Sequence, residues 1–529
     1  MPSLTLVQGS TRRTFLSDVG KGMLIATIGP ALASDLGLAR AAEKSDGEKV
    51  LSFGPLEELV CLLQETSANK LNELLVKKIR AGVDLKTLTA AAALANARTF
   101  GGEDYVGFHT MMALGPAYQM SRQLPDQLAP LPVMKVLYRN TARIQERGGR
   151  ANEVLHPVNP PAAPENSPAN FTAENLRAAV RAKDLQKAES IFAAISQRSP
   201  DEAFNALLME VQDNTEVHRV VLPYRAWDML ELCGREQAQT LLRQSVRYCV
   251  KAESWSRTAA YDKPRQVLPA MLEKYKLLEK SPGTREADDA FIEKLSQTIF
   301  ASTPEQSAEA AAAALAEGFA PDGIGEAICL AANQLILRDV GRQVRDEVPG
   351  KPMGSVHGDS IGVHACDSAN AWRNMARVAN PRNTFACLIL GAYQVALDRI
   401  ERGGNFLAWE PLPLKVNLAN IHSQEAPALL READEAIRGN LQARAAAIAH
   451  RYGQLGYPER PLMDLLLKYA ISEDGSLHAE KFYRTTTDEF AHTRPAFRWR
   501  QITALARVTA SEYGRPAAGM AEAREMLKV

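Results

Sequence analysis

Four histidines in the sequence each follow an acidic residue by five positions. The pairs are Asp104–His109, Asp213–His218, Asp359–His364 and Glu473–His478. Neutral imidazole is the commonest side-chain ligand of transition metals, and a nearby carboxylate can fix its tautomer. A shared centre of such groups would suit iron, copper, manganese or zinc. The four histidines are therefore candidate metal ligands, and the four acids are candidates to orient them.

A structural explanation of the same pattern is also open. We expect an amphipathic helix after each histidine, and an acid placed before a helix can cap its N-terminus, where free N–H groups and the helix dipole favour negative charge. Duplication of such a helix start would repeat Asp and His without any shared chemistry. The two interpretations differ in geometry, because imidazoles more than about 10 Å apart, one helix diameter, cannot serve one centre.

The segment around His364 is the richest in potential ligands. It holds His357, Asp359, His364, Cys366 and Asp367 within eleven residues. The H-E-x-x-H zinc motif is absent from the sequence, so the segment indicates a site without defining its metal. His357 is a further candidate ligand, and His364 and Asp359 are candidate catalytic groups.

Aromatic residues directly precede arginine at three places near these histidines. The pairs are Tyr224–Arg225, Trp372–Arg373 and Tyr483–Arg484. Such pairs could line a pocket for a flat or anionic ligand. In the alternative, the aromatic ring packs in the core and the arginine pairs with an acid. We assign the first two pairs as candidate cofactor-binding residues and the third pair as candidate catalytic residues.

The histidine sites belong to an apparent tandem duplication. The pattern D-x-x-G-x-H at 104–109 recurs at 359–364, and the run Glu-Arg-Gly-Gly at 146–149 recurs at 401–404. The spacing from His to Glu is 37 residues in both copies. Internal repeats of this kind indicate a fold built from copied units.

The sequence reads as helical throughout. Apolar residues have helical spacing at 71–79, and alanine-rich stretches lie at 87–97 and 309–317. We predict an all-α fold, a tandem duplication of α-helical hairpin units in which four His-bearing sub-units form two pseudo-symmetric halves. The predicted units are 42–155, 169–284, 285–415 and 416–529, with a Pro-rich linker at 156–168.

The N-terminal segment resembles a twin-arginine signal peptide. Arg12 and Arg13 carry the pattern, an apolar stretch follows, and Ala39-Arg40-Ala41 resembles a cleavage site. We therefore predict a signal at 1–41, recognition by the twin-arginine export machinery, and a periplasmic or secreted location. Cargo of this route is exported folded and often carries a metal or redox cofactor, which the resemblance implies here.

Composition narrows the possible partners. The formal net charge is zero, which argues against binding to nucleic acid. The body contains no run of eighteen apolar residues, so we expect no membrane span in the mature chain. Walker A and G-x-S-x-G motifs are also absent from the sequence. The expected partner is a small-molecule ligand or substrate.

Two segments resemble the questin oxidase-like family: the stretch Gly-Phe-His-Thr-Met-Met-Ala-Leu at 107–114 and the stretch from His364 to Arg373. The resemblance implies a helical body and an oxygen-dependent, Baeyer–Villiger-type oxidation without a classical organic cofactor. Together these observations predict an exported helical oxidoreductase with a His/carboxylate site at the interface of the duplicated halves. The alternatives are a non-enzymatic helical-repeat binding protein and a cofactor-free oxygenase.

Overall fold

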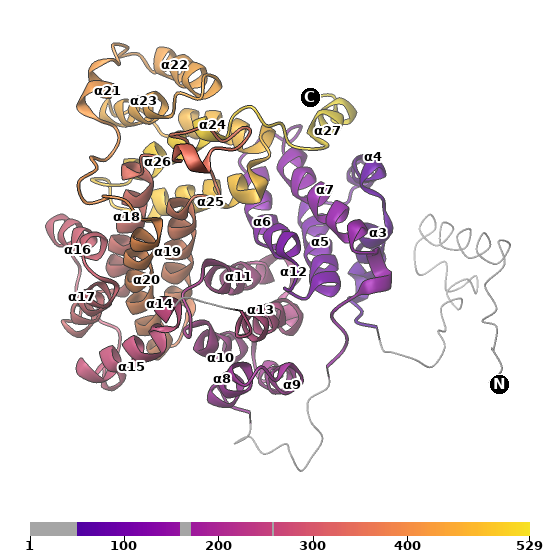
Figure 1. Ribbon diagram of the computed structural model, residues 1–529. Coiled ribbons are helices and arrows are strands. Elements are labelled where there is room, and N and C mark those ends of the chain that lie inside the picture. The colour runs from indigo at the N-terminus through magenta and orange to yellow at the C-terminus, as the bar shows by residue number, and fades with distance from the viewer. Residues whose placement is uncertain (1–49, 159–170, 256–258) are drawn as a thin grey trace, which may run out of the picture. The chain divides into compact units, whose positions relative to one another are not determined.

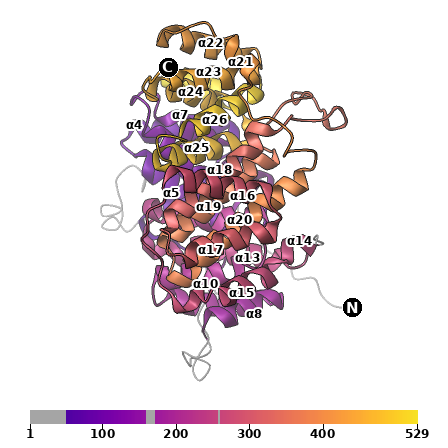
Figure 2. The ribbon, with the colours of Figure 1, turned by 90° about the vertical axis from the view of Figure 1, so that its left-hand side faces the viewer.

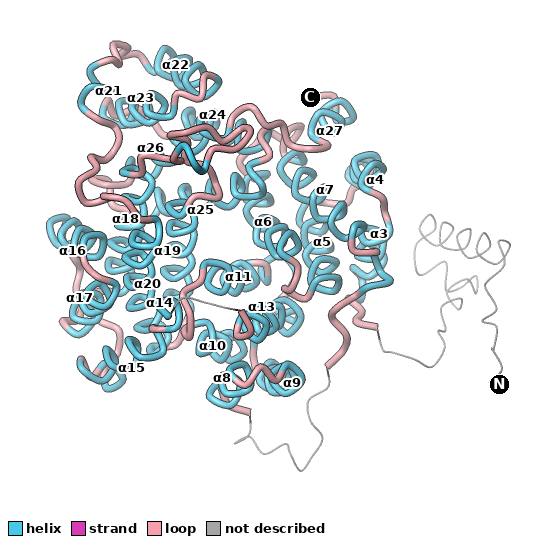
Figure 3. Tube along the Cα trace, viewed as in Figure 1, coloured by secondary structure: helices cyan, strands magenta, loops and turns pink. Residues whose placement is uncertain are grey.

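Helices make up the described part of the chain (Figures 1 and 3). The computed structural model describes residues 50–158, 171–255 and 259–529. In these residues β-pairing is confined to three isolated bridges, so the predicted all-α class is confirmed. The predicted signal at 1–41 and positions 159–168 of the predicted linker lie outside the described residues. Leu51–Val529 forms one compact unit.

The helices follow one another with short connections, and their bounds divide at the predicted junction of the halves. The helices before residue 285 are α3 (Glu57–Glu65), α4 (Ala68–Arg80), α5 (Leu85–Phe100), α6 (Tyr105–Ser121), α7 (Pro130–Glu146), α8 (Ala173–Arg181), α9 (Leu185–Ser196), α10 (Pro200–Val211), α11 (Val217–Asp228), α12 (Leu230–Cys233), α13 (Ala238–Ala252), α14 (Ala259–Asp262) and α15 (Pro264–Lys274). The helices after it are α16 (Asp289–Ala301), α17 (Pro304–Ala316), α18 (Pro321–Arg338), α19 (Ile361–Val378), α20 (Pro381–Arg402), α21 (Lys415–Ala419), α22 (Ala426–Arg438), α23 (Gln442–Gln454), α24 (Arg460–Ser472), α25 (His478–His492), α26 (Trp499–Glu512) and α27 (Met520–Leu527). Short 3-10 turns lie at Gly54–Leu56, Gly149–Asn152, Arg235–Gln237, Leu277–Glu279, Val344–Asp346 and Gly475–Leu477.

The two sets of helices pack in parallel patterns. Helices α5, α6 and α7 pack on one another as α18, α19 and α20 do, and α8, α9 and α13 correspond in the same way to α22, α23 and α26. In both Figure 1 and Figure 2, α8 and α22 lie at opposite ends of the unit. The last helix of each set crosses over, since α15 packs on α17 and α20 whereas α27 packs on α4 and α7. This is the arrangement that a duplication would produce, although the duplication itself stays a prediction.

Four helices form a closed ring that carries the repeated histidines. Helix α6 packs against α11 and α25, and α19 packs against the same two helices. Figure 1 shows these four around the middle of the unit. Because each helix begins near its histidine, the ring brings four helix starts, which are 109 residues or more apart across the contacts of α6 with α11, into one region.

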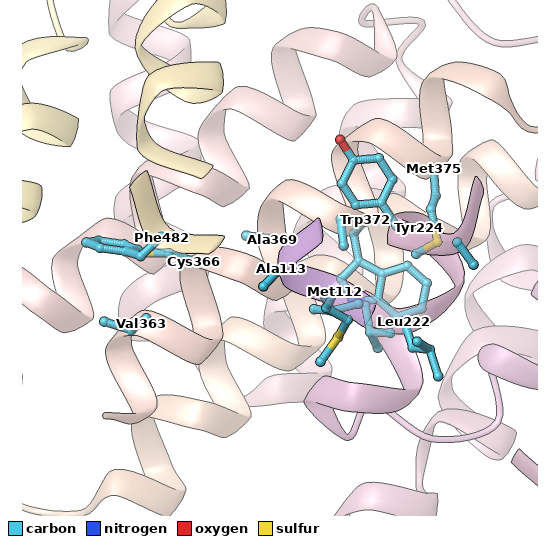
Figure 4. Packing of buried hydrophobic residues seen from close by; sticks show 14 of the residues in the cluster. Met112, Ala113, Leu222, Tyr224, Val363, Cys366, Ala369, Trp372, Met375 and Phe482 are labelled. Carbon is cyan, nitrogen blue, oxygen red and sulfur yellow. The ribbon is translucent and has the colours of Figure 1, made fainter. Parts of the chain in front are cut away.

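Apolar packing fixes the ring on one side of the histidines. Met112 of α6, Leu222 of α11 and Trp372 of α19 belong to the buried hydrophobic cluster where these helices meet (Figure 4). Helix α6 is buried over nearly its whole circumference, as expected for a helix that is apolar on all sides. The core therefore holds the ring helices by close packing rather than by surface contacts.

The glycine of the D-x-x-G-x-H motif has a packing role. A Cβ atom at Gly107 would lie 2.6 Å from the ring of Phe100, on the preceding helix α5. At Gly362 it would lie 3.0 Å from the carbonyl carbon of Leu335 and 2.9 Å from Cγ1 of Ile336, on α18. Both glycines thus let the histidine-bearing helix cross closely over the helix before it.

Substitution of Gly362 by alanine should therefore destabilise the fold. The added methyl group meets backbone atoms that cannot move independently, and overpacking of this kind costs about 1–3 kcal/mol. Gly323→Ala is the matched control, because its Cβ would meet nothing closer than 3.6 Å and alanine favours a helix by up to about 1 kcal/mol. Urea denaturation should show lower stability for Gly362→Ala and equal or higher stability for Gly323→Ala; equal stabilities in both variants would contradict this packing role.

Candidate functional site

The four repeated histidines converge in the interior of the ring. The ring centroids of His109 and His218 are 4.7 Å apart, and those of His364 and His478 are 5.1 Å apart. Between these pairs, the centroids of His109 and His478 are 5.4 Å apart and those of His218 and His364 are 6.1 Å apart. All four separations are well below one helix diameter, so the imidazoles form a single group, which we call the histidine cluster.

Each histidine reaches the cluster from the first turns of its helix. His218 and His478 are the second and first residues of α11 and α25, and His109 and His364 lie one turn into α6 and α19. The imidazoles meet through their Nε2 atoms, which are 3.2 Å apart between His109 and His218 and 3.1 Å apart between His364 and His478. The expected placement of the histidines at helix starts is therefore found.

Hydrogen bonds fix the tautomers of His109 and His218. Nδ1 of His109 lies 2.7 Å from the carbonyl oxygen of Tyr105, which can only accept, so this nitrogen carries a proton. Nδ1 of His218 lies 2.6 Å from Oε1 of Glu216. Glu216 also accepts hydrogen bonds from the backbone N–H groups of His218 and Arg219 and from the hydroxyl of Tyr248. It acts as a carboxylate, and His218 is protonated at Nδ1.

The charge of Glu216 is stabilised where it stands. Burial acts to raise the pKa of this carboxyl group, but the positive charge of His218 and the hydrogen bonds from His218 and Tyr248 outweigh burial and lower the pKa to about 2. An ionised carboxylate bound to Nδ1 raises the basicity of the imidazole at its other nitrogen.

The contact between His109 and His218 consequently brings two Nε2 lone pairs together. Such lone pairs repel unless a cation lies between them, and that cation is either a second proton on one ring or a metal ion. Burial, followed by the positive charges of Lys481 and His218, lowers the pKa of His109. His109 is therefore a neutral imidazole at neutral pH, with a lone pair available to a cation.

The second pair is also uncharged. Burial, followed by the charges of His218 and Lys481, lowers the pKa of His364 to about 3, and burial followed by the charge of Lys481 lowers the pKa of His478. Nδ1 of His478 is buried without a hydrogen-bond partner. One N–H···N hydrogen bond between the Nε2 atoms would satisfy this pair without a cation.

The spacing of the rings is compatible with one ion, but the ring orientations require adjustment. Four imidazoles bound to one ion at about 2.0–2.1 Å would have neighbouring centroids about 5 Å apart. As the side chains stand, however, no three His, Cys, Asp or Glu side chains in the described part of the chain are placed to hold a metal ion. The histidine cluster is two close pairs, and a shared ion requires these pairs to close around it.

The predicted acid partners do not orient the histidines. Asp104 caps α6 by accepting a 2.8 Å hydrogen bond from the N–H of Gly107, and it also binds Arg143 and Arg147. Burial raises the pKa of Asp104, but the bonds from Arg143, Gly107 and Arg147 outweigh it and lower the pKa to about 2. Capping is thus correct for Asp104, but its carboxylate points at its own helix rather than at His109.

The other three acids are engaged elsewhere. Asp213 pairs with two arginines of α8, Asp359 pairs with Arg342 and Lys351, and Glu473 accepts the N–H groups of Gly514 and Arg515. The predicted orienting role of these acids is therefore wrong. Five residues is too long a separation, because the helix starts between the acid and the histidine: Glu216 caps α11, Ser360 caps α19, and α25 begins at His478 itself.

His357 lies outside the histidine cluster. Its Nδ1 accepts a 2.7 Å hydrogen bond from Arg515, so this lone pair is already used. Together with Asp359 it lines a separate pocket of about 330 Å³. The assignment of His357 as a ligand of the same centre is wrong for this arrangement, because the seven residues between His357 and His364 include the turn that starts α19.

The aromatic–arginine pairs are mostly used in internal contacts. Trp372 is buried and donates a 2.7 Å hydrogen bond to Gln394, and Arg373 pairs with Glu489 at 2.6 Å. The alternative of core packing and ion pairing fits these two residues.

The other two pairs lie beside the cluster helices. The guanidinium of Arg225 lies 5.0 Å from the ring of Tyr224 and donates to Thr485 at 3.3 Å. The Tyr483 hydroxyl donates a 2.9 Å hydrogen bond to Gln123, and Arg484 lies 3.8 Å from Asp488. None of these residues contacts an imidazole of the histidine cluster in the interactions that the described residues show.

The structure adds residues that the sequence patterns missed. Glu216 and Tyr248 bind each other and His218, and the exposed ring of Tyr105 lies 4.3 Å from that of His109. Lys481 is buried on α25, and burial lowers its pKa to about 8, against the opposing charge of Asp367. Glu216 could have been found as an acid directly before a helix; Tyr248 left no signal, because it comes from another helix.

Comparison of the chain with protein-family models, with curated proteins and with solved structures gave no match. The resemblance to the questin oxidase-like family is therefore untested. In the residues that the structure describes, the helices are too short or too polar to cross a bilayer, as expected from the sequence.

The neutral imidazoles predict that metal-free protein loses stability in mild acid. Below about pH 6.5 the histidines of the unfolded chain take up protons, whereas buried His364, with a pKa of about 3, does not. The unfolded state then binds more protons, so each such group lowers stability by about 1 kcal/mol per pH unit.

This effect can be measured as a slope. In chelator, the free energy of unfolding should fall between pH 6.5 and pH 4.5, and it should fall less steeply by about 1 kcal/mol per pH unit in His364→Gln. His422→Gln, at an exposed position outside the cluster, should keep the wild-type slope. Equal slopes in all three proteins would show that His364 is not held neutral.

Proposed function

We propose that the histidine cluster binds one transition-metal ion and that the protein is an exported oxidoreductase. The observation that carries this proposal is the 3.2 Å contact between Nε2 of His109 and Nε2 of His218, both of which present lone pairs. A cation between the two nitrogens removes their repulsion, and a metal ion does so without charging an imidazole whose burial opposes protonation.

The surroundings of the cluster support a metal with nitrogen ligands. Imidazole suits iron, copper, manganese and zinc, and the carboxylate of Glu216 behind His218 is the outer partner that metal-bound histidines commonly have. His109 and His478 are only 3% and 4% exposed, so an ion here would be shielded from water. The twin-arginine resemblance supports export of the protein in a folded, cofactor-bearing form.

The alternatives make different demands. A non-enzymatic helical-repeat protein needs no convergence of the histidines, and the observed separations of 4.7–6.1 Å give no support to it. A cofactor-free oxygenase would use the same interior without an ion, and its case depends on the metal content of the purified protein.

Metal analysis tests the centre directly. Untagged protein from an exporting host should contain about one iron, copper, manganese or zinc ion per chain, and His218→Gln and His364→Gln should lose it while remaining helical by circular dichroism. His422→Gln, at an exposed position, should retain the ion. Wild-type protein that binds none of these ions, even after incubation with each, would refute the centre. Zinc alone would leave a metal site but refute the oxidoreductase, because zinc does not change oxidation state.

Export is tested separately. In a bacterium with the twin-arginine route, the mature chain should begin near Ala42 and appear in the periplasmic or secreted fraction. Changing Arg12 and Arg13 together to lysine should leave the precursor in the cytoplasm, whereas Arg40→Lys should still allow recognition. Wild-type levels of exported protein from the double variant would show that the signal assignment is wrong.

A further inference from the structure

A chain of side-chain contacts connects the histidine cluster to the surface. Nδ1 of His218 lies 2.6 Å from Oε1 of Glu216, and Oε2 of Glu216 accepts a 2.7 Å hydrogen bond from the hydroxyl of Tyr248. The ring of Tyr248 meets that of Trp255 edge to face, with centroids 5.4 Å apart. Tyr248 is 2% exposed and Trp255 is 42% exposed. Four successive side chains thus lead from a buried imidazole to solvent.

The types of these side chains suit the movement of single electrons. Tyrosine and tryptophan are the side chains that lose one electron most readily, apart from the sulfur-containing ones. A tyrosine that loses an electron also releases its phenolic proton, so a hydrogen-bonded acceptor is needed beside it. Glu216 is in that position for Tyr248, and the same carboxylate holds His218.

The connection exists at one histidine only. Among the four imidazoles, His218 is the one whose Nδ1 binds a carboxylate in the described residues, since Nδ1 of His109 binds a backbone carbonyl and Nδ1 of His478 has no partner. The position two residues before His478, which corresponds to Glu216, is Ser476. A purely structural helix start would not need the tyrosine and tryptophan that one copy adds.

We propose that Trp255 and Tyr248 form an electron-entry path through which a small phenolic donor at the surface reduces the histidine cluster. The inference rests on the proposed redox metal ion, and it adds the class of donor and the route. The exposed indole of Trp255 offers an aromatic face on which a phenol can stack. Donors too large to reach the buried imidazoles can therefore still be oxidised.

The path balances electrons and protons. Tyr248 gives one electron to the oxidised centre, and its phenolic proton passes to Glu216 across the 2.7 Å hydrogen bond. Trp255 then gives one electron to the tyrosyl radical, and the proton returns from Glu216 to Tyr248. The phenol finally reduces the Trp255 radical cation and releases its own proton to water. The donor has lost one electron and one proton, the centre has gained one electron, and dioxygen is the acceptor that reoxidises the centre.

A merely structural role for these residues predicts a different pattern. If Tyr248 only holds Glu216 in place, then Tyr248→Phe disturbs the cluster but Trp255→Phe leaves it unchanged, because Trp255 makes no hydrogen bond to Glu216 among the described contacts. Trp255→Phe is therefore the decisive variant. Tyr452→Phe is the matched control, since Tyr452 is a buried tyrosine 6.1 Å from the ring of Trp499 and belongs to other helices.

The first experiment does not depend on the metal. A photo-generated one-electron oxidant in solution should produce a tryptophan radical that decays into a tyrosyl radical, followed by transient absorption and freeze-quench electron paramagnetic resonance. Tyr248→Phe should lengthen the life of the tryptophan radical, Trp255→Phe should reduce the yield of the tyrosyl radical, and Tyr452→Phe should match wild type. Identical traces for Tyr248→Phe, Trp255→Phe and wild type would overturn the path.

The second experiment uses the metal-loaded protein with a phenol and dioxygen. Tyr248→Phe and Trp255→Phe should oxidise the phenol at least about tenfold more slowly than wild type, with unchanged metal content, whereas Tyr452→Phe should not differ. Unchanged rates in both variants would overturn the path and leave the metal centre standing. A wild-type protein without metal would overturn the proposed function, and the photo-oxidation experiment would still decide the path.

Discussion

The close approach of four imidazoles in a dry interior is the constraint on which the rest of this structure depends. Each ring carries polar nitrogens that are costly to bury without partners, and protonation of the rings is opposed by burial. Two of the Nε2 atoms face each other as acceptors, because their Nδ1 atoms are held as donors by the Tyr105 carbonyl and by Glu216. The fold has to hold this unfavourable arrangement in place, and a bound cation would make it favourable.

The ring of helices achieves this with two kinds of contact. Helix α6 is held by apolar packing, since its residues around His109 are almost all buried and hydrophobic. Helix α25 is held mainly by buried polar contacts: Glu480 pairs with Lys135 of α7 at 2.6 Å, and Glu489 accepts from Arg373 of α19 at 2.6 Å. Such buried pairs fix position well because breaking either partner leaves an uncompensated charge.

The two halves differ most where the chemistry is proposed. Both contribute two histidines from equivalent helices, and the glycines at 107 and 362 make the same close crossing. Only the first half adds Glu216, Tyr248 and Trp255 behind its histidine. A pseudo-symmetric scaffold thus carries an asymmetric site, in which one imidazole is joined to the surface and the opposite ones are enclosed.

The sequence by itself determined the features that are set within a few residues. Helical periodicity was sufficient for the all-α class, and the repeated motifs placed each histidine near a helix start, as the structure shows. The capping role of Asp104 was also readable, because an N-cap acts on N–H groups two or three residues away.

Only the tertiary structure decided which groups meet. The contact of His109 with His218 spans 109 residues, and that of Tyr248 with Glu216 joins two helices. Sequence spacing suggested that Asp213, Asp359 and Glu473 would orient the histidines, but each finds a partner on another element, and His357 is directed to Arg515. Local backbone geometry is fixed by neighbouring residues, whereas the partner of a side chain depends on how helices from distant parts of the chain pack.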